Sequence, residues 1–196
     1  GGGPAWGCAY IIISWLCYEY YGDTEILKKH FGNMEHWMEF LATGVRNGIV
    51  EAEGTDKDCL GEWSTPGETL IPPRFVNTYF YGYCASLMEN IAKVLGKEEE
   101  RQSYSVLKEN TIQAFRREFF HKETGRYSIG AQGSEAFAYK LGAVKEQEKE
   151  QVFRYMAKHV AKECDGHLDT GIFGTPYLFE TLVDNGYGDI AYQMIT

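Results

Sequence analysis

Residues 9–21 read AYIIISWLCYEYY, and this stretch is the strongest indication of the fold class in the sequence. Its side chains are apolar almost all the way round a helix, which predicts a helix that is buried on both sides. Gly22-Asp23-Thr24 ends this helix and can cap the one that follows. A helix covered on both sides needs neighbours on two faces, so the stretch favours a layered, all-helical fold.

The rest of the chain keeps the helical period, and no run alternates persuasively as a strand would. The pattern predicts further helices at residues 25–46, with a break or kink at Gly32-Asn33, and at 74–95, 98–120, 134–141, 145–162, 176–185 and 189–196. Helices 98–120 and 145–162 each have a charged face, and residues 145–150 are predicted to be solvated. This alternation predicts a ring of paired helices. The helices of the inner layer would be covered on both sides, and those of the outer layer would be exposed to solvent on one side.

The composition excludes several classes of protein. The chain has 196 residues, of which 44% are apolar and 15% aromatic, and this supports one domain with a real core. A net charge of −9 without a basic stripe argues against nucleic acid as a partner. No apolar run approaches the roughly 20 residues that span a bilayer, so no membrane partner is expected either. The first and last residues read as cut points in a longer chain.

The cysteines and histidines show no metal-binding pattern. The five cysteines are odd in number and form no CxxC, so neither a disulfide framework nor a zinc site is expected. Cys17 and Cys84 lie in apolar helical stretches and are expected to be free thiols that are buried. No metal and no cofactor is predicted. The histidines without ligand spacing to one another, which are expected at the surface, are His30, His36, His121 and His159.

Two loops carry the strongest functional signal. Residues 60–68 read LGEWSTPGE, within a long loop at 47–73, and residues 166–177 read GHLDTGIFGTPY. Each combines an aromatic ring, a carboxylate and several Gly or Pro residues, and functional groups are common on loops that a rigid scaffold holds. A ring can stack on the apolar face of a pyranose while a carboxylate accepts hydrogen bonds from its hydroxyls. The two loops therefore indicate a carbohydrate site.

The whole chain resembles glycoside hydrolase family 78, the bacterial α-L-rhamnosidases. The resemblance rests on PAWG (residues 4–7), YEYYGD (18–23), LGEWSTP (60–66) and GHLDTGIFGT (166–175), of which the last is the most specific. It implies an all-α fold that is part of an (α/α)6 barrel of the six-hairpin glycosidase type. Residues 1–196 would be a single domain, the central portion of the catalytic domain, with inner and outer helices in an incomplete ring.

The resemblance also implies a reaction. Members of this family cleave terminal α-L-rhamnose with inversion, which uses a carboxylic acid and a carboxylate base about 6.5–9.5 Å apart. The family's general acid lies in an Asp-Glu-Arg segment before the Trp-Gly motif, and its general base lies in a Trp-Glu segment beyond Thr196. Neither segment is in this chain, so the catalytic residues are unassigned and the isolated chain is expected to be inactive.

Four residues are implied as substrate-binding. Trp6 and Trp63 match family tryptophans that line the rhamnose site, where the 6-methyl group favours an apolar wall; the alternatives are that Trp6 seals the first helix and that Trp63 anchors its loop. Glu62, where Asp is common, is a candidate to bind hydroxyls, or else a solvated acid or a helix-pairing partner. His167 is a candidate pocket residue, or else a hydrogen-bonded structural group. Cys8 stands where Asp is usual, which removes a charge.

The remaining loop groups are predicted to have structural or solvated roles. Asp169 and Thr170 are expected to cap their turn rather than to react. Asp56, Asp58 and Glu68 are expected to be solvated charges.

Partners and rival functions stay open. The resemblance implies a rhamnose-containing glycan as the partner. An incomplete ring leaves apolar edges open, so copies of the chain are expected to associate through them. Family members are often periplasmic or secreted, yet no signal peptide is seen here and no compartment is predicted. The rivals are another (α/α)6 glycosidase with a different terminal sugar, and a non-catalytic helical module that binds a glycan or a protein without turnover.

Overall fold

The computed structural model describes residues 3–51, 61–67 and 71–196. These residues group into two compact units. Unit 1 comprises residues 1–59 and 77–114, and unit 2 comprises residues 60–76 and 115–196. Two long helices, α3 (Pro73–Val94) and α4 (Glu98–Phe119), contribute residues to both. The assignment of residues 1–196 to a single domain stays a prediction.

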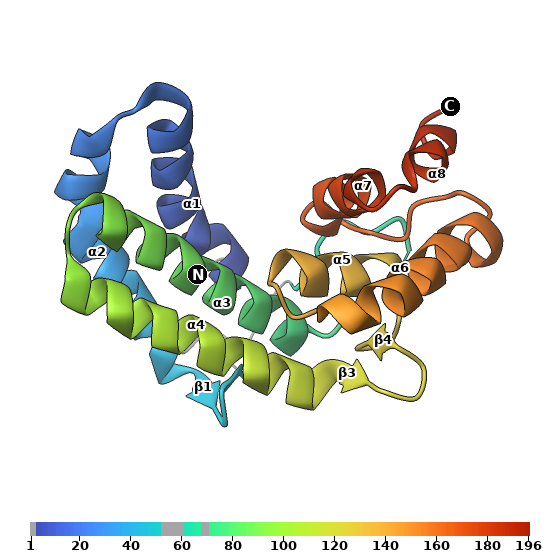
Figure 1. Ribbon diagram of the computed structural model, residues 1–196, viewed down its shortest axis with the longest axis horizontal. Coiled ribbons are helices and arrows are strands. Elements are labelled where there is room, and N and C mark those ends of the chain that lie inside the picture. The colour runs from blue at the N-terminus through green and yellow to red at the C-terminus, as the bar shows by residue number, and fades with distance from the viewer. Residues whose placement is uncertain (1–2, 52–60, 68–70) are drawn as a thin grey trace. The chain divides into compact units, whose positions relative to one another are not determined.

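Unit 1 is built on a pair of helices, α1 (Gly3–Tyr21) and α2 (Thr24–Thr43), which pack side by side (Figure 1). Asp23 caps α2 as predicted, because its Oδ1 accepts hydrogen bonds from the amides of Glu25 and Ile26 at 3.0 and 3.1 Å. The predicted break at Gly32-Asn33 is wrong, since α2 runs through both residues. Buried side chains flank this point on either side, and their packing outweighs the helix cost of one glycine, about 1 kcal/mol.

The first helix differs from its prediction in two ways. It begins at Gly3 rather than near Ala9. Only one of its faces is buried among the described residues: Cys8 and Ile11 are fully buried, whereas Ile13 is 58% exposed. The prediction of burial on both sides is therefore wrong for this chain, because nothing in its described part packs on the second apolar face. Association of copies through such a face stays a prediction.

Two glycines in unit 1 give a matched test of helix packing. A Cβ on Gly7 of α1 would overlap the indole ring of Trp37 on α2, while a Cβ on Gly32 of α2 would meet nothing within 4 Å. We expect Gly7→Ala to lower the free energy of unfolding by about 1–3 kcal/mol, because the ring must be pushed out of its packing position. Gly32→Ala should raise it by about 0.5–1 kcal/mol through helix propensity alone. Urea unfolding of both variants measures the two signs, and a Gly7→Ala protein as stable as Gly32→Ala would contradict this packing.

Two short antiparallel hairpins correct the expectation that the chain has no strands. The first pairs β1 (Val45–Arg46) with β2 (Ile49–Val50), and the second pairs β3 (Phe120–His121) with β4 (Arg126–Tyr127). Asn47 and Gly48 form the first turn with φ of 52° and 84°. Asn-Gly is the usual pair for a two-residue hairpin turn, because both residues must adopt positive φ.

Unit 2 contains the remaining helices. They are α5 (Gln132–Lys140), the short 3-10 helix η1 (Glu146–Glu148), α6 (Lys149–Lys158), the π-helix η2 (His159–Glu163), α7 (Gly174–Asp184) and α8 (Gly188–Gln193). Helix α5 packs on α6 and on α7, and α7 packs on α8 (Figure 1). These bounds agree with the predicted helices to within a few residues, except that the predicted helix at 145–162 divides into three segments.

The core of unit 2 is aromatic. Phe75 lies at its centre, with its ring centroid 4.6 Å from Phe115, 5.0 Å from Phe119 and 6.2 Å from Phe137.

The charged segment 145–150 lies mostly at the surface. Most of its residues are exposed as predicted, but Glu148 accepts two hydrogen bonds from the Arg116 guanidinium, at 2.7 and 2.8 Å. Within the described residues, no helix combines the length and the apolar character needed to cross a bilayer.

Candidate functional site

The two loops that carry the sequence signal are joined to each other in unit 2. Glu62 Oε1 accepts hydrogen bonds from the backbone amides of Gly171 at 2.5 Å and Gly174 at 2.8 Å. One residue further along, the Trp63 carbonyl accepts a hydrogen bond from the Ile172 amide at 3.0 Å. Residues 61–63 therefore lie directly against residues 171–174, although they are more than a hundred positions away in the sequence.

Close approach of the two loops explains the glycines in the second one. A Cβ on Gly171 would collide with the Trp63 carbonyl oxygen and come within 2.8 Å of Glu62 Oε1. A Cβ on Gly174 would come within 2.9 Å of the same carboxylate oxygen. Only glycine leaves room for the carboxylate to reach both amides. The Gly-x-x-Gly spacing is thus a requirement of this contact.

Glu62 is a buried acid with an altered proton affinity. Its side chain is 1% exposed. Burial raises the pKa of Glu62 to about 7, although the amides of Gly174 and Gly171 act to lower it. The second oxygen, Oε2, is buried and has no hydrogen-bond partner within the described part of the chain. Glu62 is therefore not the solvated acid considered from the sequence, and its visible role is to fix the loop that carries Trp63.

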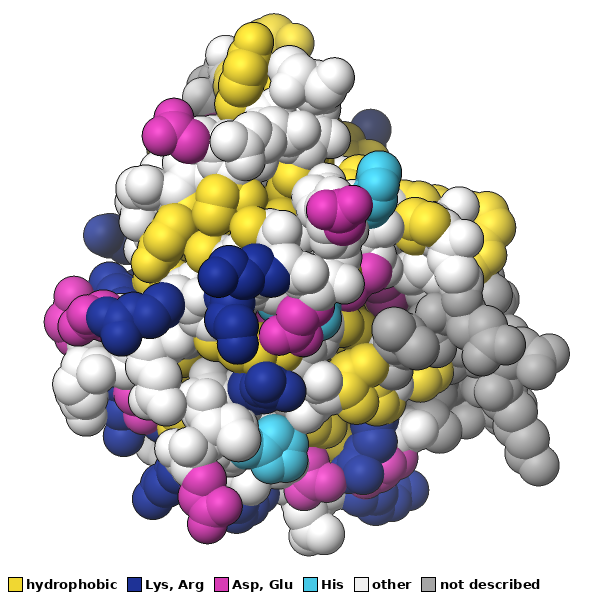
Figure 2. Space-filling view, turned by 90° about the vertical axis from the view of Figure 1, so that its right-hand side faces the viewer, with side chains coloured by type: hydrophobic (Ala, Val, Ile, Leu, Met, Phe, Trp, Pro, Cys, Tyr) yellow, Lys and Arg dark blue, Asp and Glu magenta, His cyan; other side chains and the backbone are white. Residues whose placement is uncertain are grey.

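The two tryptophans implied as substrate-binding, Trp6 and Trp63, are both accessible to solvent. Trp63 is 46% exposed and stands next to Ser64, whose φ of 61° turns the chain just after the ring. Trp6 is 40% exposed and belongs to α1 in unit 1. In the face shown in Figure 2, acidic and basic side chains are intermixed, and hydrophobic side chains reach the surface between them.

Gln132 organises the second loop from the first residue of α5. Its side-chain amide donates to the His167 carbonyl at 2.7 Å, and its Oε1 accepts from the Asp169 amide at 3.2 Å. Its backbone amide donates to Asp169 Oδ1 at 3.2 Å, so Asp169 caps α5 rather than its own turn. The His167 side chain is exposed. Thr170 is buried and its hydroxyl pairs with that of Thr175 at 2.8 Å.

Sequence reasoning missed two buried polar residues of α5, Gln132 and Glu135. Glu135 Oε1 accepts a hydrogen bond from the Tyr127 amide at 3.1 Å, and burial raises the pKa of Glu135 to about 8. The available signal was a Gln and a Glu three positions apart in a helix whose other residues before Lys140 are small or aromatic. Residues on one helix face at that spacing point the same way, which is inward here.

A hollow of about 570 Å³ lies beside the hairpin of β3 and β4, lined by residues 120–124, 126, 128 and 129. None of the four residues implied as substrate-binding lines it. The candidate site therefore consists of the two joined loops and does not include this hollow.

The family of the chain follows from its full-length match. Residues 1–196 match the bacterial alpha-L-rhamnosidase 6 hairpin glycosidase domain. The chain belongs to this family. Two curated relatives, both called alpha-L-rhamnosidase, come from Formosa agariphila and Streptomyces avermitilis. The first is 27% identical over 97% of this chain and 20% of its own length, and the second is 27% identical over 100% and 18%.

Solved rhamnosidase structures share the fold. The alpha-L-rhamnosidase from Dictyoglumus thermophilum is 31% identical with a TM-score of 0.89, over 98% of this chain and 22% of that protein. The Streptomyces avermitilis enzyme, solved in complex with L-rhamnose, is 24% identical with a TM-score of 0.84, over 95% and 17%. The all-α, six-hairpin assignment is thereby confirmed. This rhamnosidase-family chain spans about a fifth of the length of the curated relatives it matches.

Some predictions for the rhamnosidase-family chain concern residues outside its described part. Residues 52–60 and 68–70 are not described, and Asp56, Asp58 and Glu68 lie among them. Cys59 lies there too. The described cysteines, at positions 8, 17, 84 and 164, are free thiols. Cys84 is buried as predicted, whereas Cys17 is only partly buried, so its predicted burial is wrong.

Proposed function

We propose that this chain contributes part of the sugar-binding wall of an α-L-rhamnosidase that acts on terminal α-L-rhamnose. The observation that carries the proposal is Trp63, a nearly half-exposed ring on a loop whose backbone is fixed by Glu62. Membership of the rhamnosidase family and the relatives' names support it. The rhamnose complex of the Streptomyces avermitilis enzyme supports a carbohydrate ligand.

The chemistry assigns Trp63 the apolar part of recognition. Rhamnose carries a methyl group where most hexoses carry a hydroxymethyl group, so one edge of the sugar is apolar. An indole ring that lies against this edge and the C–H face of the pyranose gains contact area without desolvating a hydroxyl. In our proposal His167, which is exposed, donates to or accepts from a sugar hydroxyl. The role of Trp6, which belongs to unit 1, stays a prediction.

Glu62 then positions the site rather than reacting in it. An inverting glycosidase needs an acid that reaches the glycosidic oxygen and a base that reaches a water. One oxygen of Glu62 is held by two backbone amides and the other is buried, so neither is presented to a ligand. We infer that the general acid and base come from sequence outside this chain, and that Glu62 keeps Trp63 in a fixed place.

The proposal predicts the effect of removing the ring. In the protein that carries this chain, Trp63→Ala should raise KM for p-nitrophenyl α-L-rhamnopyranoside about tenfold or more, since a stacking contact contributes about 0.5–1.5 kcal/mol beyond its area. Trp63→Phe keeps an aromatic ring, so its KM should lie much closer to that of the wild type than to that of Trp63→Ala. Steady-state kinetics and calorimetric titration with L-rhamnose measure both changes.

A control distinguishes the loss of a sugar contact from general damage. Tyr192 on α8 is also an exposed aromatic residue, at a position outside both loops, and Tyr192→Ala should leave KM unchanged. Unchanged KM in Trp63→Ala would contradict the proposed wall. Rhamnose binding without any turnover in the whole protein would favour the non-catalytic module instead.

A further inference from the structure

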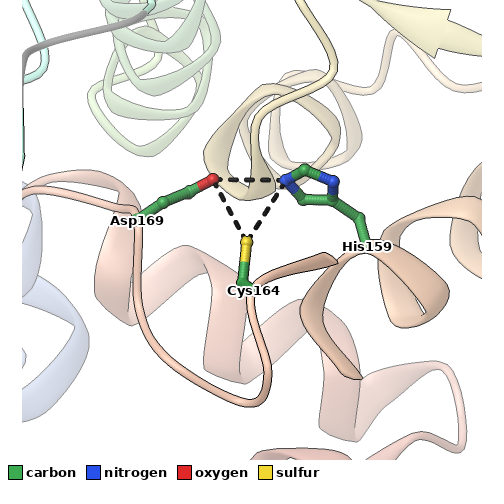
Figure 3. Close-up of side chains that lie close together, drawn as sticks. All are labelled: His159, Cys164 and Asp169. Atoms are coloured by element: carbon green, nitrogen blue, oxygen red, sulfur yellow. Dashed lines mark hydrogen bonds and ion pairs between the residues drawn. The ribbon is translucent and has the colours of Figure 1, made fainter. Parts of the chain in front are cut away.

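Three side chains that can bind a metal converge where α6 ends. His159, Cys164 and Asp169 point toward one another from the π-helix η2 and the loop that follows it (Figure 3). His159 Nε2 lies 3.5 Å from Cys164 Sγ and 3.3 Å from Asp169 Oδ2, and the sulfur lies 3.8 Å from that oxygen. The sequence prediction that His159 is a surface residue is wrong, because its side chain is only 15% exposed.

The π-helix produces this convergence. In η2 the Cys164 amide donates to the His159 carbonyl at 3.0 Å, which is a bond between residues five positions apart. The wider turn brings Cys164 beside His159, which it would not reach in an α-helix, because residues five apart lie on different faces there. Asp165 and Gly166 then take φ of 50° and 75° and reverse the chain, which returns Asp169 to the same place. Single π-turns inside helices often occur at functional sites.

The spacing of the three atoms matches the edges of a zinc tetrahedron. With bonds of about 2.3 Å to sulfur, 2.05 Å to nitrogen and 2.0 Å to oxygen, tetrahedral angles place S and N about 3.6 Å apart, N and O about 3.3 Å apart, and S and O about 3.5 Å apart. The observed distances are 3.5, 3.3 and 3.8 Å. A zinc ion can therefore enter the triangle with movements of a few tenths of an ångström.

Groups around the triangle orient its ligands. The other ring nitrogen of His159, Nδ1, lies 2.9 Å from Glu163 Oε2. A carboxylate on Nδ1 holds the proton there and leaves Nε2 free to bind a metal, which is the usual arrangement at zinc-bound histidines. Asp169 is held in turn by the backbone amide of Gln132, at 3.2 and 3.4 Å from its two oxygens.

We propose that His159 Nε2, Cys164 Sγ and Asp169 Oδ2 form a site for a zinc-type divalent cation, with Glu163 as the positioning residue for His159. The donor set of one imidazole, one thiolate and one carboxylate suits Zn²⁺ and its spectroscopic substitute Co²⁺. Three protein ligands leave the fourth corner to water. The bound ion would tie the start of the 166–174 loop to the end of α6, and the site does not depend on any sugar-related role of this chain.

The rival is a cluster held together by hydrogen bonds alone. Asp169, together with Glu163, raises the pKa of His159, so the same three groups can also share protons without an ion. The two cases differ in what the thiol does, because zinc and cobalt bind it as the thiolate and a hydrogen-bonded cluster does not require this.

Cobalt titration of the metal-stripped, tag-free protein tests the proposal. With Co²⁺ in the micromolar range, we expect a thiolate-to-cobalt charge-transfer band in the near ultraviolet and visible bands of four-coordinate intensity, both displaced by Zn²⁺. Cys164→Ser should lose the charge-transfer band, and His159→Gln and Asp169→Asn should each weaken binding at least tenfold. Glu163→Gln should weaken it about tenfold and keep the band. Zn²⁺ should also raise the melting temperature of the wild type but not of Cys164→Ser.

A second cysteine variant controls for binding of cobalt to other thiols. Cys17→Ser removes a free, part-exposed thiol of α1 and should leave the cobalt spectrum unchanged. Far-ultraviolet circular dichroism establishes that each variant is folded before titration, and Cys164→Ala serves if Cys164→Ser does not fold. A charge-transfer band that survives in both Cys164 variants, or the absence of Co²⁺ and Zn²⁺ binding in the wild type, would overturn the site and leave the hydrogen-bonded cluster.

Discussion

Gly171→Ala is expected to destabilise the protein by more than about 3 kcal/mol and to abolish rhamnose binding. The added Cβ would overlap the carbonyl oxygen of Trp63, a backbone atom that cannot rotate away, and would crowd Glu62 Oε1 at 2.8 Å. Relief requires the two loops to separate, which leaves the buried Glu62 carboxyl and the amides of Gly171 and Gly174 without partners. Each buried polar group left unpaired costs about 1–3 kcal/mol.

Urea unfolding followed by rhamnose titration measures both effects. Gly67→Ala and Gly188→Ala are matched controls, because a Cβ at either position would meet nothing within 4 Å. Gly67 lies on the same loop as Trp63, so its variant also reports whether that loop tolerates an alanine. If Gly171→Ala unfolds at the same urea concentration as Gly67→Ala, the contact between the two loops is not as described.

The second large effect is a loss of stability as the pH rises from about 4.5 to about 7. The pKa of Glu62 is about 7 in the folded chain, against an ordinary value of 4.5. Between these values the folded state keeps a proton that the unfolded chain has released, so its stability is full below pH 4.5 and falls as the pH rises through 7. A shift of this size corresponds to at most about 3 kcal/mol. Glu135, with a pKa of about 8, extends the fall in the same direction.

Glu62→Gln isolates the contribution of one residue. Glutamine keeps an oxygen for the amides of Gly171 and Gly174 but cannot ionise, so the variant should gain on the wild type as the pH rises from 4.5 to 7.5. Urea unfolding at pH 4.5, 6 and 7.5 gives the difference at each pH. Glu99→Gln, which changes an exposed acid of α4, should follow the wild type throughout. A Glu62→Gln profile parallel to the wild type would place the titrating group elsewhere.

The long helices were predictable because their signals are local. The stop at Gly22, the cap at Asp23 and the three-four spacing along α2, α3 and α4 are all contained within a few turns of chain. The hairpin at Asn47-Gly48 was equally local, and its turn pair would have identified it. The burial of α1 was not predictable from local signals. An apolar helix face indicates that a packing partner would be favourable, but it does not show whether this chain contains that partner.

For the candidate site, the sequence indicated which loops carry suitable residue types but not which residues contact one another. An aromatic ring, a carboxylate and glycines marked the two loops, but the bond between Glu62 and Gly171 joins positions 109 apart, and no periodic pattern encodes such a pairing. The same holds for Gln132 and Asp169, which are 37 apart. His159 was expected at the surface, and its approach to Cys164 was not predictable for another reason. Residues five apart share a face only in a π-helix, and the sequence pattern there is that of an ordinary amphipathic helix.

The bonds of Gln132 have a consequence for ionic strength. Its side chain holds the 166–174 loop through two neutral hydrogen bonds, to the His167 carbonyl and from the Asp169 amide, and Glu62 meets its amide partners out of contact with solvent. Dissolved ions screen exposed charge pairs such as Arg154 with Glu150, yet have little hold on neutral or buried contacts. We therefore expect the contacts between the loops to be nearly independent of salt concentration, while the exposed ion pairs on the outer faces of the helices weaken as salt is added.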